Sequence, residues 1–312
     1  MSIALIGYGE VGKILAEDLR TQDQAVTVYD LKLGSPAGAP LREHAAQHGV
    51  RLAADHADAL RGAALVISAV TASQTVAVAQ ACAPACAPAC APAIGDVFFL
   101  DFNSASPGAK AEAAAHIDGA GGRYVEGAVM TLISGYRIAV PLLLGGPHAA
   151  ALLPRLTALG FSARLASARL GVASATKLCR SVMIKGLEVM LIESLTTARH
   201  YGVEDAVLAS LAETYPGVDW HKQAGYAFQR VIEHGRRRGE EMLEAARTVH
   251  DAGLVPLSAS GTAQRDTWIA EQGDAGVFGS RGTPGFARSS DWRIEADRLL
   301  ASVASARAKD SA

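Results

Sequence analysis

The chain has 312 residues, of which 50% are hydrophobic and 19% are charged, and its formal net charge at pH 7 is −2. This near-neutral charge argues against nucleic acid as the main partner. No apolar run reaches the roughly 20 residues that span a bilayer, and the N-terminus has no basic region or cleavage site. We therefore expect a cytoplasmic protein with no membrane partner.

The first predicted element is a short apolar strand, Ile3 to Ile6, which leads directly into a Gly-x-Gly-x-x-Gly motif and a helical pattern. Gly7 permits a tight turn, Gly9 lets the backbone approach a pyrophosphate, and Gly12 lets the helix pack closely on the strand. The helix N-terminus then faces the phosphates. The alternative is a glycine-rich turn in an unrelated α/β protein. The predicted cofactor contacts here are Gly7, Tyr8, Gly9, Glu10, Val11 and Gly12.

A second apolar strand, residues 25–29, ends at Asp30. An acid roughly 20 residues beyond the glycines is placed to accept a hydrogen bond from a ribose 2′-hydroxyl, and it repels a 2′-phosphate. Lys32 is close enough along the chain to weaken that repulsion. We predict NAD as the cofactor, with NADP as the alternative, and we expect both Asp30 and Lys32 to contact it.

Strands and helices alternate along the first half of the chain, which predicts a doubly wound, mostly parallel sheet of the Rossmann type. The expected strands are 65–70, 97–101, 124–125, 138–144 and 163–165, and the expected helices include 107–117 and 148–159. Ligands bind beyond the carboxyl ends of such strands. Val70, Thr71, Asn103 and Ser104 all lie there.

A tandem repeat, Ala-Cys-Ala-Pro, occupies residues 81–92 and contains Cys82, Cys86 and Cys90. The recurring prolines argue against a regular helix, so we expect an expanded connection between strands, prone to oxidation. Its spacing of four residues differs from the two-residue gap of zinc ribbons. The sequence therefore predicts no metal site.

The second half of the chain has helical periodicity and no strand signals, which predicts an all-α C-terminal domain. We expect one long helix over 173–201, further helices near 204–214, 219–234, 237–252, 259–272 and 289–308, and a glycine-rich loop at 273–286. The predicted domains are a dinucleotide-binding domain, residues 1–168, and a substrate and dimerisation domain, residues 169–312.

Lys177 lies in the second turn of the long predicted helix, where the two predicted domains join. A lysine in a desolvated cleft has a lowered pKa, which suits an acid/base role. Most helical lysines are instead solvated surface residues.

Several motifs occur in an order that resembles the β-hydroxyacid dehydrogenase and 6-phosphogluconate dehydrogenase superfamily. The motifs shared with the superfamily are the three glycines and residues 68–71, 101–107, 126–130 and 171–177. Two further motifs, residues 185–188 and 236–242, resemble one branch specifically, which has a C-terminal domain of unknown function, DUF1932. The resemblance implies that Lys177 exchanges the proton of a substrate hydroxyl. It also implies that the helical domains form a homodimer.

The resemblance implies substrate contacts, and the chain departs from the family pattern at two places. The asparagine expected after the lysine is replaced by Arg180 and Ser181, and a Ser-Gly-Gly sequence is replaced by Met130 and Thr131. We therefore expect a less polar or bulkier substrate than 3-hydroxyisobutyrate. The expected substrate contacts are Asn103, Ser104, Thr131, Arg180, Ser181 and Arg238, and the expected nicotinamide contacts are Val70, Thr71 and Asn103.

Each of these assignments has a simpler alternative. Asn103 and Ser104 are also ordinary turn and cap residues, and packing alone can account for Val70. Lys185 and Glu188 are spaced to form a surface pair, and residues 236–241 can form a solvated, salt-bridged helix face.

The sequence as a whole predicts an NAD(P)-dependent oxidoreductase that interconverts a hydroxyl and a carbonyl on a small, carboxylated substrate. An imine-reducing enzyme is one alternative, although such relatives usually replace the lysine. A non-catalytic, redox-sensing dinucleotide-binding protein is the other.

Overall fold

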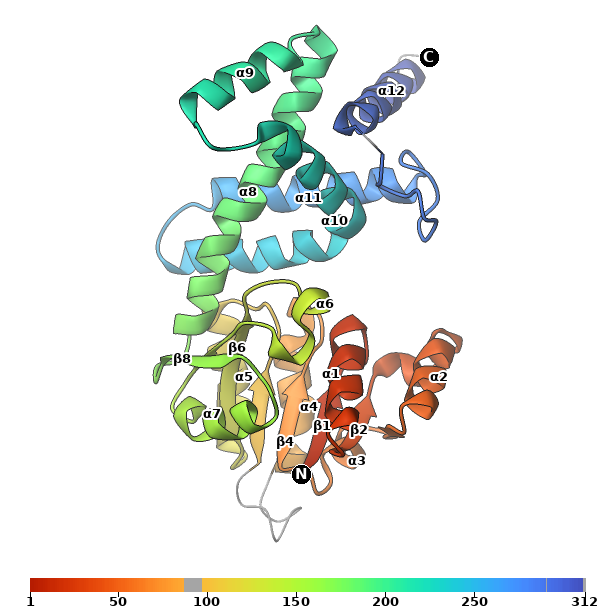
Figure 1. The fold of residues 1–312 in the computed structure, drawn as a ribbon. Coiled ribbons are helices and arrows are strands. Elements are labelled where there is room, and N and C mark those ends of the chain that lie inside the picture. Colours follow the sequence, from red (N-terminus) through yellow and green to blue (C-terminus); the bar gives the residue numbers. More distant parts are fainter. Residues whose placement is uncertain (87–96, 290, 311–312) are drawn as a thin grey trace. The chain divides into compact units, whose positions relative to one another are not determined.

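A computed structural model describes residues 1–86, 97–289 and 291–310 (Figure 1). The chain divides into two compact units, Met1–Cys179 and Arg180–Ala312. Helix α8 (Val172–Tyr201) begins in the first unit and continues into the second. Among the described residues there is no helix with the length and hydropathy needed to cross a bilayer.

The first unit is built on one sheet, which has eight strands in the described part of the chain, in the order β3-β2-β1-β4-β5-β6-β7-β8. All neighbouring strands are parallel except β6 and β7, which are antiparallel. The strands are β1 (Ser2–Ile6), β2 (Ala25–Tyr29), β3 (Arg51–Leu52), β4 (Leu65–Ser68), β5 (Phe98–Asp101), β6 (Arg123–Val129), β7 (Leu142–Gly145) and β8 (Ala163–Ser167).

Helices pack on both faces of this sheet, so the strands carry apolar residues on both sides. Strand β1 illustrates this, because Ile3 and Leu5 belong to one buried cluster while Ala4 and Ile6 belong to another. The helices of the first unit are α1 (Glu10–Thr21), α2 (Ala39–Gln47), α3 (His56–Leu60), α4 (Thr75–Cys86), α5 (Pro107–Gly119), α6 (Ile133–Tyr136) and α7 (Ala149–Ala158). The predicted fold class is confirmed.

The strand predicted at 138–144 is shorter than expected, because β7 begins at Leu142 and a 3₁₀ turn occupies Arg137–Ala139. A long-range contact explains the turn. Arg137 donates hydrogen bonds to Glu17 and Asp18 on α1, and the Ile138 amide also donates to Asp18. These bonds outweigh the β propensity of the local sequence.

The prediction of a non-helical connection across the Ala-Cys-Ala-Pro repeat was wrong at its start. Helix α4 continues through Pro84 to Cys86. The carbonyl that loses its intrahelical partner to a proline belongs to Gln80, which is exposed to solvent. Cys82 and Cys86 are buried, and burial raises the pKa of both thiols, that of Cys86 to about 11, which disfavours oxidation. Cys90 lies outside the described residues.

The second unit is helical throughout its described secondary structure and has its own apolar core. Besides the later part of α8, it comprises α9 (Glu204–Thr214), α10 (Trp220–Asp251), α11 (Leu257–Asp274) and α12 (Trp292–Asp310). The two helices predicted at 219–234 and 237–252 are in fact the single helix α10. Its Gly235 is not a break, because a Cβ there would lie 2.5 Å from the Asp266 carbonyl oxygen of α11; glycine lets α10 and α11 pack closely side by side (Figure 1).

Candidate active site

The glycine motif between β1 and α1 has the geometry that a dinucleotide-binding turn needs. Gly7 has φ +94°, and a Cβ at this position would lie 2.4 Å from the Ala69 carbonyl oxygen. A Cβ at Gly12 would lie 2.2 Å from the Gly7 carbonyl oxygen. Gly9, in contrast, has no neighbouring atom within 4 Å of its would-be Cβ. The backbone at Gly9 is therefore open to a ligand.

The N-terminus of α1 is also open to an anion. Gly9 is its N-cap, and no side chain accepts a hydrogen bond from the first turn. The amide groups at this end, from Glu10 to Gly12, therefore remain for a phosphate. Tyr8, between the first two glycines, is fully buried and supports the turn from behind. These residues fit the pyrophosphate of a dinucleotide.

Asp30 follows β2 and is turned toward the glycine loop. Its carboxylate accepts a hydrogen bond from the Tyr8 amide at 2.8 Å and another from the Lys32 amide at 2.9 Å. Each oxygen accepts one of these bonds and keeps a lone pair for a further donor, such as a ribose hydroxyl. The Lys32 backbone thus helps to hold Asp30, whereas its side chain is on the exposed surface.

Asn103 joins the loops that follow β4 and β5. Its side-chain carbonyl accepts from the Val70 amide at 2.7 Å, and its Nδ2 donates to the Ser68 hydroxyl at 3.1 Å. The side-chain carbonyl and amide of Asn103 are thus both used in holding this loop pair. Thr71 is exposed beside it. Both loops lie at the carboxyl edge of the sheet, as do the glycine turn and Asp30.

A buried ion pair supports the Asn103 loop from below. Asp101 accepts hydrogen bonds from the Asn103 amide at 2.8 Å and from the Tyr124 hydroxyl at 2.6 Å, and it pairs with Lys110 Nζ at 2.9 Å. Burial, followed by the charge of Asp101, raises the Tyr124 pKa well above its ordinary value. The sequence analysis missed Lys110 and Tyr124, because nothing local distinguishes them from a surface lysine and a core tyrosine.

Lys177 reaches this same edge from α8. Its Nζ donates a hydrogen bond to the Ser104 hydroxyl at 2.5 Å, and both side chains are half-buried. Within the first unit, the structure therefore brings together the predicted acid/base lysine and the predicted substrate loop. These residues are separated by 73 positions in the sequence.

Glu126 holds the beginning of α8. One carboxylate oxygen accepts from the Ala173 amide at 2.9 Å, and the other accepts from the Ser174 hydroxyl at 3.0 Å. Glycine is required opposite it, because a Cβ at Gly145 would lie 2.1 Å from Glu126 Oε1. A negative charge also suits a helix N-terminus. Glu126 is thus a positioning residue for the turn before Lys177, a role that the sequence analysis did not assign.

Met130 and Thr131 stand where the family pattern has Ser-Gly-Gly. Met130 packs against Ala128, Leu143 and Ala173, the last at the beginning of α8. Thr131 is exposed in the turn after β6. The surface next to the beginning of α8 is therefore apolar at Met130, where the family pattern has polar and small residues.

Three of the expected substrate contacts lie in the second unit. Arg180 is exposed and Ser181 is buried, three and four residues beyond Lys177 on α8. Arg238 on α10 is buried and pairs with Glu188. The predicted Lys185–Glu188 surface pair was wrong, because both side chains are buried and Lys185 pairs with Glu241 instead.

The helix segment 236–241 is only partly the salt-bridged face that its spacing suggests. Arg237 pairs with Glu241 at 2.6 Å, as expected. Arg236 pairs with Asp274 on α11 rather than with Glu240. Packing of α11 against α10 explains this difference, since it places a carboxylate beside Arg236.

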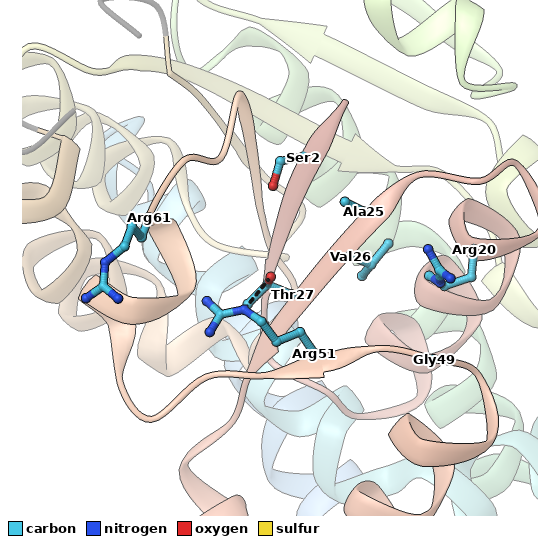
Figure 2. A pocket seen from close by; sticks show the side chains of 8 residues that line it. All are labelled: Ser2, Arg20, Ala25, Val26, Thr27, Gly49, Arg51 and Arg61. Carbon is cyan, nitrogen blue, oxygen red and sulfur yellow. Dashed lines mark hydrogen bonds between the residues drawn. The ribbon is translucent and has the colours of Figure 1, made fainter. Parts of the chain in front are cut away.

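A separate hollow of about 550 Å³ lies at the opposite, amino edge of the sheet (Figure 2). It is lined by Ser2, Arg20, Ala25, Val26, Thr27, Gly49, Arg51 and Arg61. Arg51 donates to Thr27 and to Asp58, and Arg20 donates to backbone carbonyls. Because ligands of such sheets bind at the carboxyl edge, this hollow is not part of the candidate active site.

Comparison with known proteins places this architecture in a family. Residues 198–269 match the model of a domain of unknown function, DUF1932, and residues 2–87 match the model described as NADP oxidoreductase, coenzyme F420-dependent. The crystal structure of a conserved hypothetical protein from Sinorhizobium meliloti 1021 is 36% identical, covers 96% of this chain and 97% of that chain, and has a TM-score of 0.72. The chain belongs to the DUF1932 branch of the β-hydroxyacid dehydrogenase superfamily. The matched oxidoreductase model supports an NAD(P)-dependent oxidoreductase of this family.

Structures that are less similar in sequence share the fold of this chain. A conserved protein of unknown function, described as structurally similar to 3-hydroxyacid dehydrogenases, is 26% identical over 88% of this chain and 99% of that chain, with a TM-score of 0.65. A Mycobacterium tuberculosis 3-hydroxyisobutyrate dehydrogenase is 17% identical over 96% and 98% of the two chains, with a TM-score of 0.69. An Aspergillus terreus imine reductase is 19% identical over 87% and 95%, with a TM-score of 0.54.

Proposed function

We propose that this chain is an NAD-dependent dehydrogenase or reductase that interconverts a hydroxyl and a carbonyl group on a small, carboxylated substrate. The observation that supports this most directly is the Lys177–Ser104 hydrogen bond at the carboxyl edge of the sheet. It brings an amine to the loop of Asn103, whose side chain also holds the Val70 backbone next to Gly7.

In this proposal Lys177 is the general acid and base. During oxidation its neutral amine accepts the proton of the substrate hydroxyl, and during reduction its ammonium returns that proton to the forming alkoxide. The nicotinamide, when bound, supplies the hydride acceptor or donor. The Ser104 hydroxyl orients the amine, and Glu126 fixes the helix that carries it. Precise placement of these groups accounts for much of the expected rate.

The turnover of Lys177→Ala tests this role. With a panel of hydroxyacids, sugar acids and hydroxy amino acids, we expect turnover to fall by about 10²–10⁴-fold because the proton acceptor is lost. Dinucleotide affinity, measured by calorimetry, should stay the same, since the glycine loop is intact. Lys222→Ala, at an exposed position of α10, is the matched control.

Other outcomes of the same assay would reject the proposal. A wild-type chain that binds a dinucleotide but turns over none of the panel is a binding or sensing protein. Turnover of cyclic imines alone would identify an imine reductase, a class that shares the fold. Undiminished turnover in Lys177→Ala would assign the proton transfer to another group.

We further propose that Asp30 selects NAD over NADP. The Lys32 backbone and residues 7–12 form the rest of the proposed dinucleotide site. The Asp30 carboxylate is held at the end of β2 by the Tyr8 and Lys32 amides. Asp30→Ser removes the repulsion of a 2′-phosphate. We expect the NADP/NAD ratio of kcat/KM to rise by about tenfold, equivalent to about 1.4 kcal/mol. An unchanged ratio would mean that Asp30 is not the selector.

The substrate side is proposed from Met130, Thr131 and the residues that follow Lys177. Met130 provides apolar contact area next to α8, so a substrate with an apolar substituent is favoured over 3-hydroxyisobutyrate. Thr131, Arg180, Ser181 and Arg238 remain the proposed polar contacts, with Asn103 acting through its loop. Small 3-hydroxyacids proving to be the best substrates would contradict this proposal.

We also propose that the chain forms a homodimer through its helical domain, residues 169–312. Met183, Ile184, Leu187 and Met190 form an exposed apolar stripe on α8. Their positions recur with helical spacing, so they lie on one side of the helix. Light scattering after size-exclusion chromatography should give twice the mass of the chain, and a monomeric mass would reject the dimer.

A further inference from the structure

Two histidines and a glutamate gather outside the candidate active site, on α1 and α2 of the first unit. His44 lies in the last turn of α2 and His48 is its C-cap residue, while Glu17 lies on α1. One potential ligand atom from each side chain lies within 4.8 Å of the other two. All three side chains are partly buried, so a small ion can reach them from solvent.

The geometry already resembles a ligand set. His44 and His48 are one helical turn apart, and their rings stack with centroids 4.4 Å apart. Glu17 Oε1 lies 2.8 Å from His44 Nε2. The other ring nitrogen of His44 lies 2.8 Å from the Tyr8 hydroxyl. A ligand histidine characteristically has such an oxygen partner on its second nitrogen, which fixes the tautomer and the ring orientation.

The charges around the cluster leave the carboxylate available. The hydrogen bond from Arg137 holds the Glu17 pKa below its ordinary value. Arg137 binds the other oxygen, Oε2, and also pairs with Asp18. Its positive charge is therefore balanced by two carboxylates. Arg20 also lies nearby, but it donates to the backbone carbonyl of His48 and not to the rings.

We propose that Glu17, His44 and His48 bind a divalent transition-metal ion of the zinc class, with water as the fourth ligand. Two imidazoles and a carboxylate suit Zn²⁺ or Co²⁺ better than Mg²⁺ or Ca²⁺, which prefer oxygen ligands alone. Tetrahedral bonds of about 2.0–2.2 Å place the ligand atoms about 3.4 Å apart, so binding replaces the 2.8 Å contact between Glu17 Oε1 and His44 Nε2 by two metal–ligand bonds and requires side-chain rotations.

In the bound state His44 Nε2 coordinates the ion, so Nδ1 carries the ring proton and donates it to the Tyr8 oxygen. Protons compete with the ion for the ligand atoms, so metal affinity falls as pH is lowered. The ion links α1 to α2. Its site adjoins the glycine loop, because the hydroxyl of Tyr8 contacts His44 while the Tyr8 amide donates to Asp30. We expect the ion to stabilise the first unit.

Cobalt titration of the full-length, metal-stripped protein tests the site. The wild type should bind one Co²⁺ per chain with a tetrahedral absorption spectrum and no thiolate charge-transfer band. Glu17→Gln and His48→Gln should each weaken binding by at least about tenfold. His250→Gln, which changes a histidine that is 79% exposed on α10, is the matched control and should bind as the wild type does.

Thermal unfolding gives a second readout that does not depend on catalysis. Zn²⁺ should raise Tm in the wild type and in His250→Gln but not in His48→Gln, because only an ion bound to the folded state stabilises it. Circular dichroism of the metal-free variants checks that each is folded. Equal cobalt binding by the wild type and His48→Gln would overturn the proposal. A thiolate band would do so too, since it would assign the ion to a cysteine.

Discussion

The two units bury charged side chains in different ways. In the first unit, Asp101 is 1% exposed and receives hydrogen bonds from a backbone amide and the Tyr124 hydroxyl as well as the Lys110 ammonium. In the second unit, Asp266 is 0% exposed, and neither of its carboxylate oxygens accepts a hydrogen bond from the described residues. Its nearest positive group, Arg238 Nε, is 3.8 Å away.

This difference shows that a buried carboxylate finds more hydrogen-bond partners at the end of a strand than between packed helices. Asp101 sits at a strand end, where the parallel sheet brings several loops to one place. Asp266 sits between helices, where Arg238 is already paired with Glu188 and Lys185 with Glu241. Desolvation lowers the pKa of Lys185 and of Arg238 and raises that of Asp266. The first unit stabilises its buried charges fully, and the second does so only in part.

Asp101→Asn should have the largest effect on stability. It leaves the Lys110 ammonium buried without a counter-ion, and breaking such a pair costs about 3–5 kcal/mol. The free energy of unfolding from urea denaturation measures this cost. If the comparison between the units is sound, Asp266→Asn will cost much less at the same pH. Equal losses in the two variants would break it.

Asp266 should make stability depend on pH. Its pKa is raised from an ordinary 3.8 to about 6, so between these values the folded state binds more protons than the unfolded state. Its contribution to stability is therefore present below pH 3.8 and is lost as pH rises through about 6. The full change is about 3 kcal/mol.

The Asp266→Asn variant isolates that contribution. Its stability relative to the wild type should increase as pH rises from about 4 to 7, because the variant has no proton to lose. Denaturant unfolding at several pH values measures the difference. A constant difference across this range would show that the carboxylate is neutralised by other means.

Glycine substitutions on α10 test the helix packing that surrounds Asp266, with the smallest expected effect. Gly235→Ala places a Cβ 2.5 Å from the Asp266 carbonyl oxygen, and such overpacking costs about 1–3 kcal/mol. Gly225→Ala is the control, because a Cβ there has no neighbour within 4 Å. It should stabilise the helix by up to about 1 kcal/mol. Similar thermal shifts in both variants would argue against close packing at Gly235.

The sequence by itself determined the features that depend on neighbouring residues. Apolar runs predicted the strands, and helical spacing predicted α9 over 204–214, where the structure has it. The glycine turn was predictable for the same reason, since the left-handed φ of Gly7 is a local requirement. Asp30 was identified as a site candidate because it directly follows a strand, and Ser104 because it lies in the loop after a strand that resembles the family's substrate loop.

Only the tertiary structure decided the contacts between residues far apart in the chain. Glu126 reaches α8 across 47 positions, and the Arg137 pairing with Asp18 across 119 positions turns a predicted strand into a 3₁₀ turn. Helix α10 was predicted as two helices, 219–234 and 237–252, because the close packing of Gly235 against α11 is invisible locally. The physical reason is common to all three cases: the packing of distant elements sets which partner a side chain meets, and that partner's charge or size then overrides local preference.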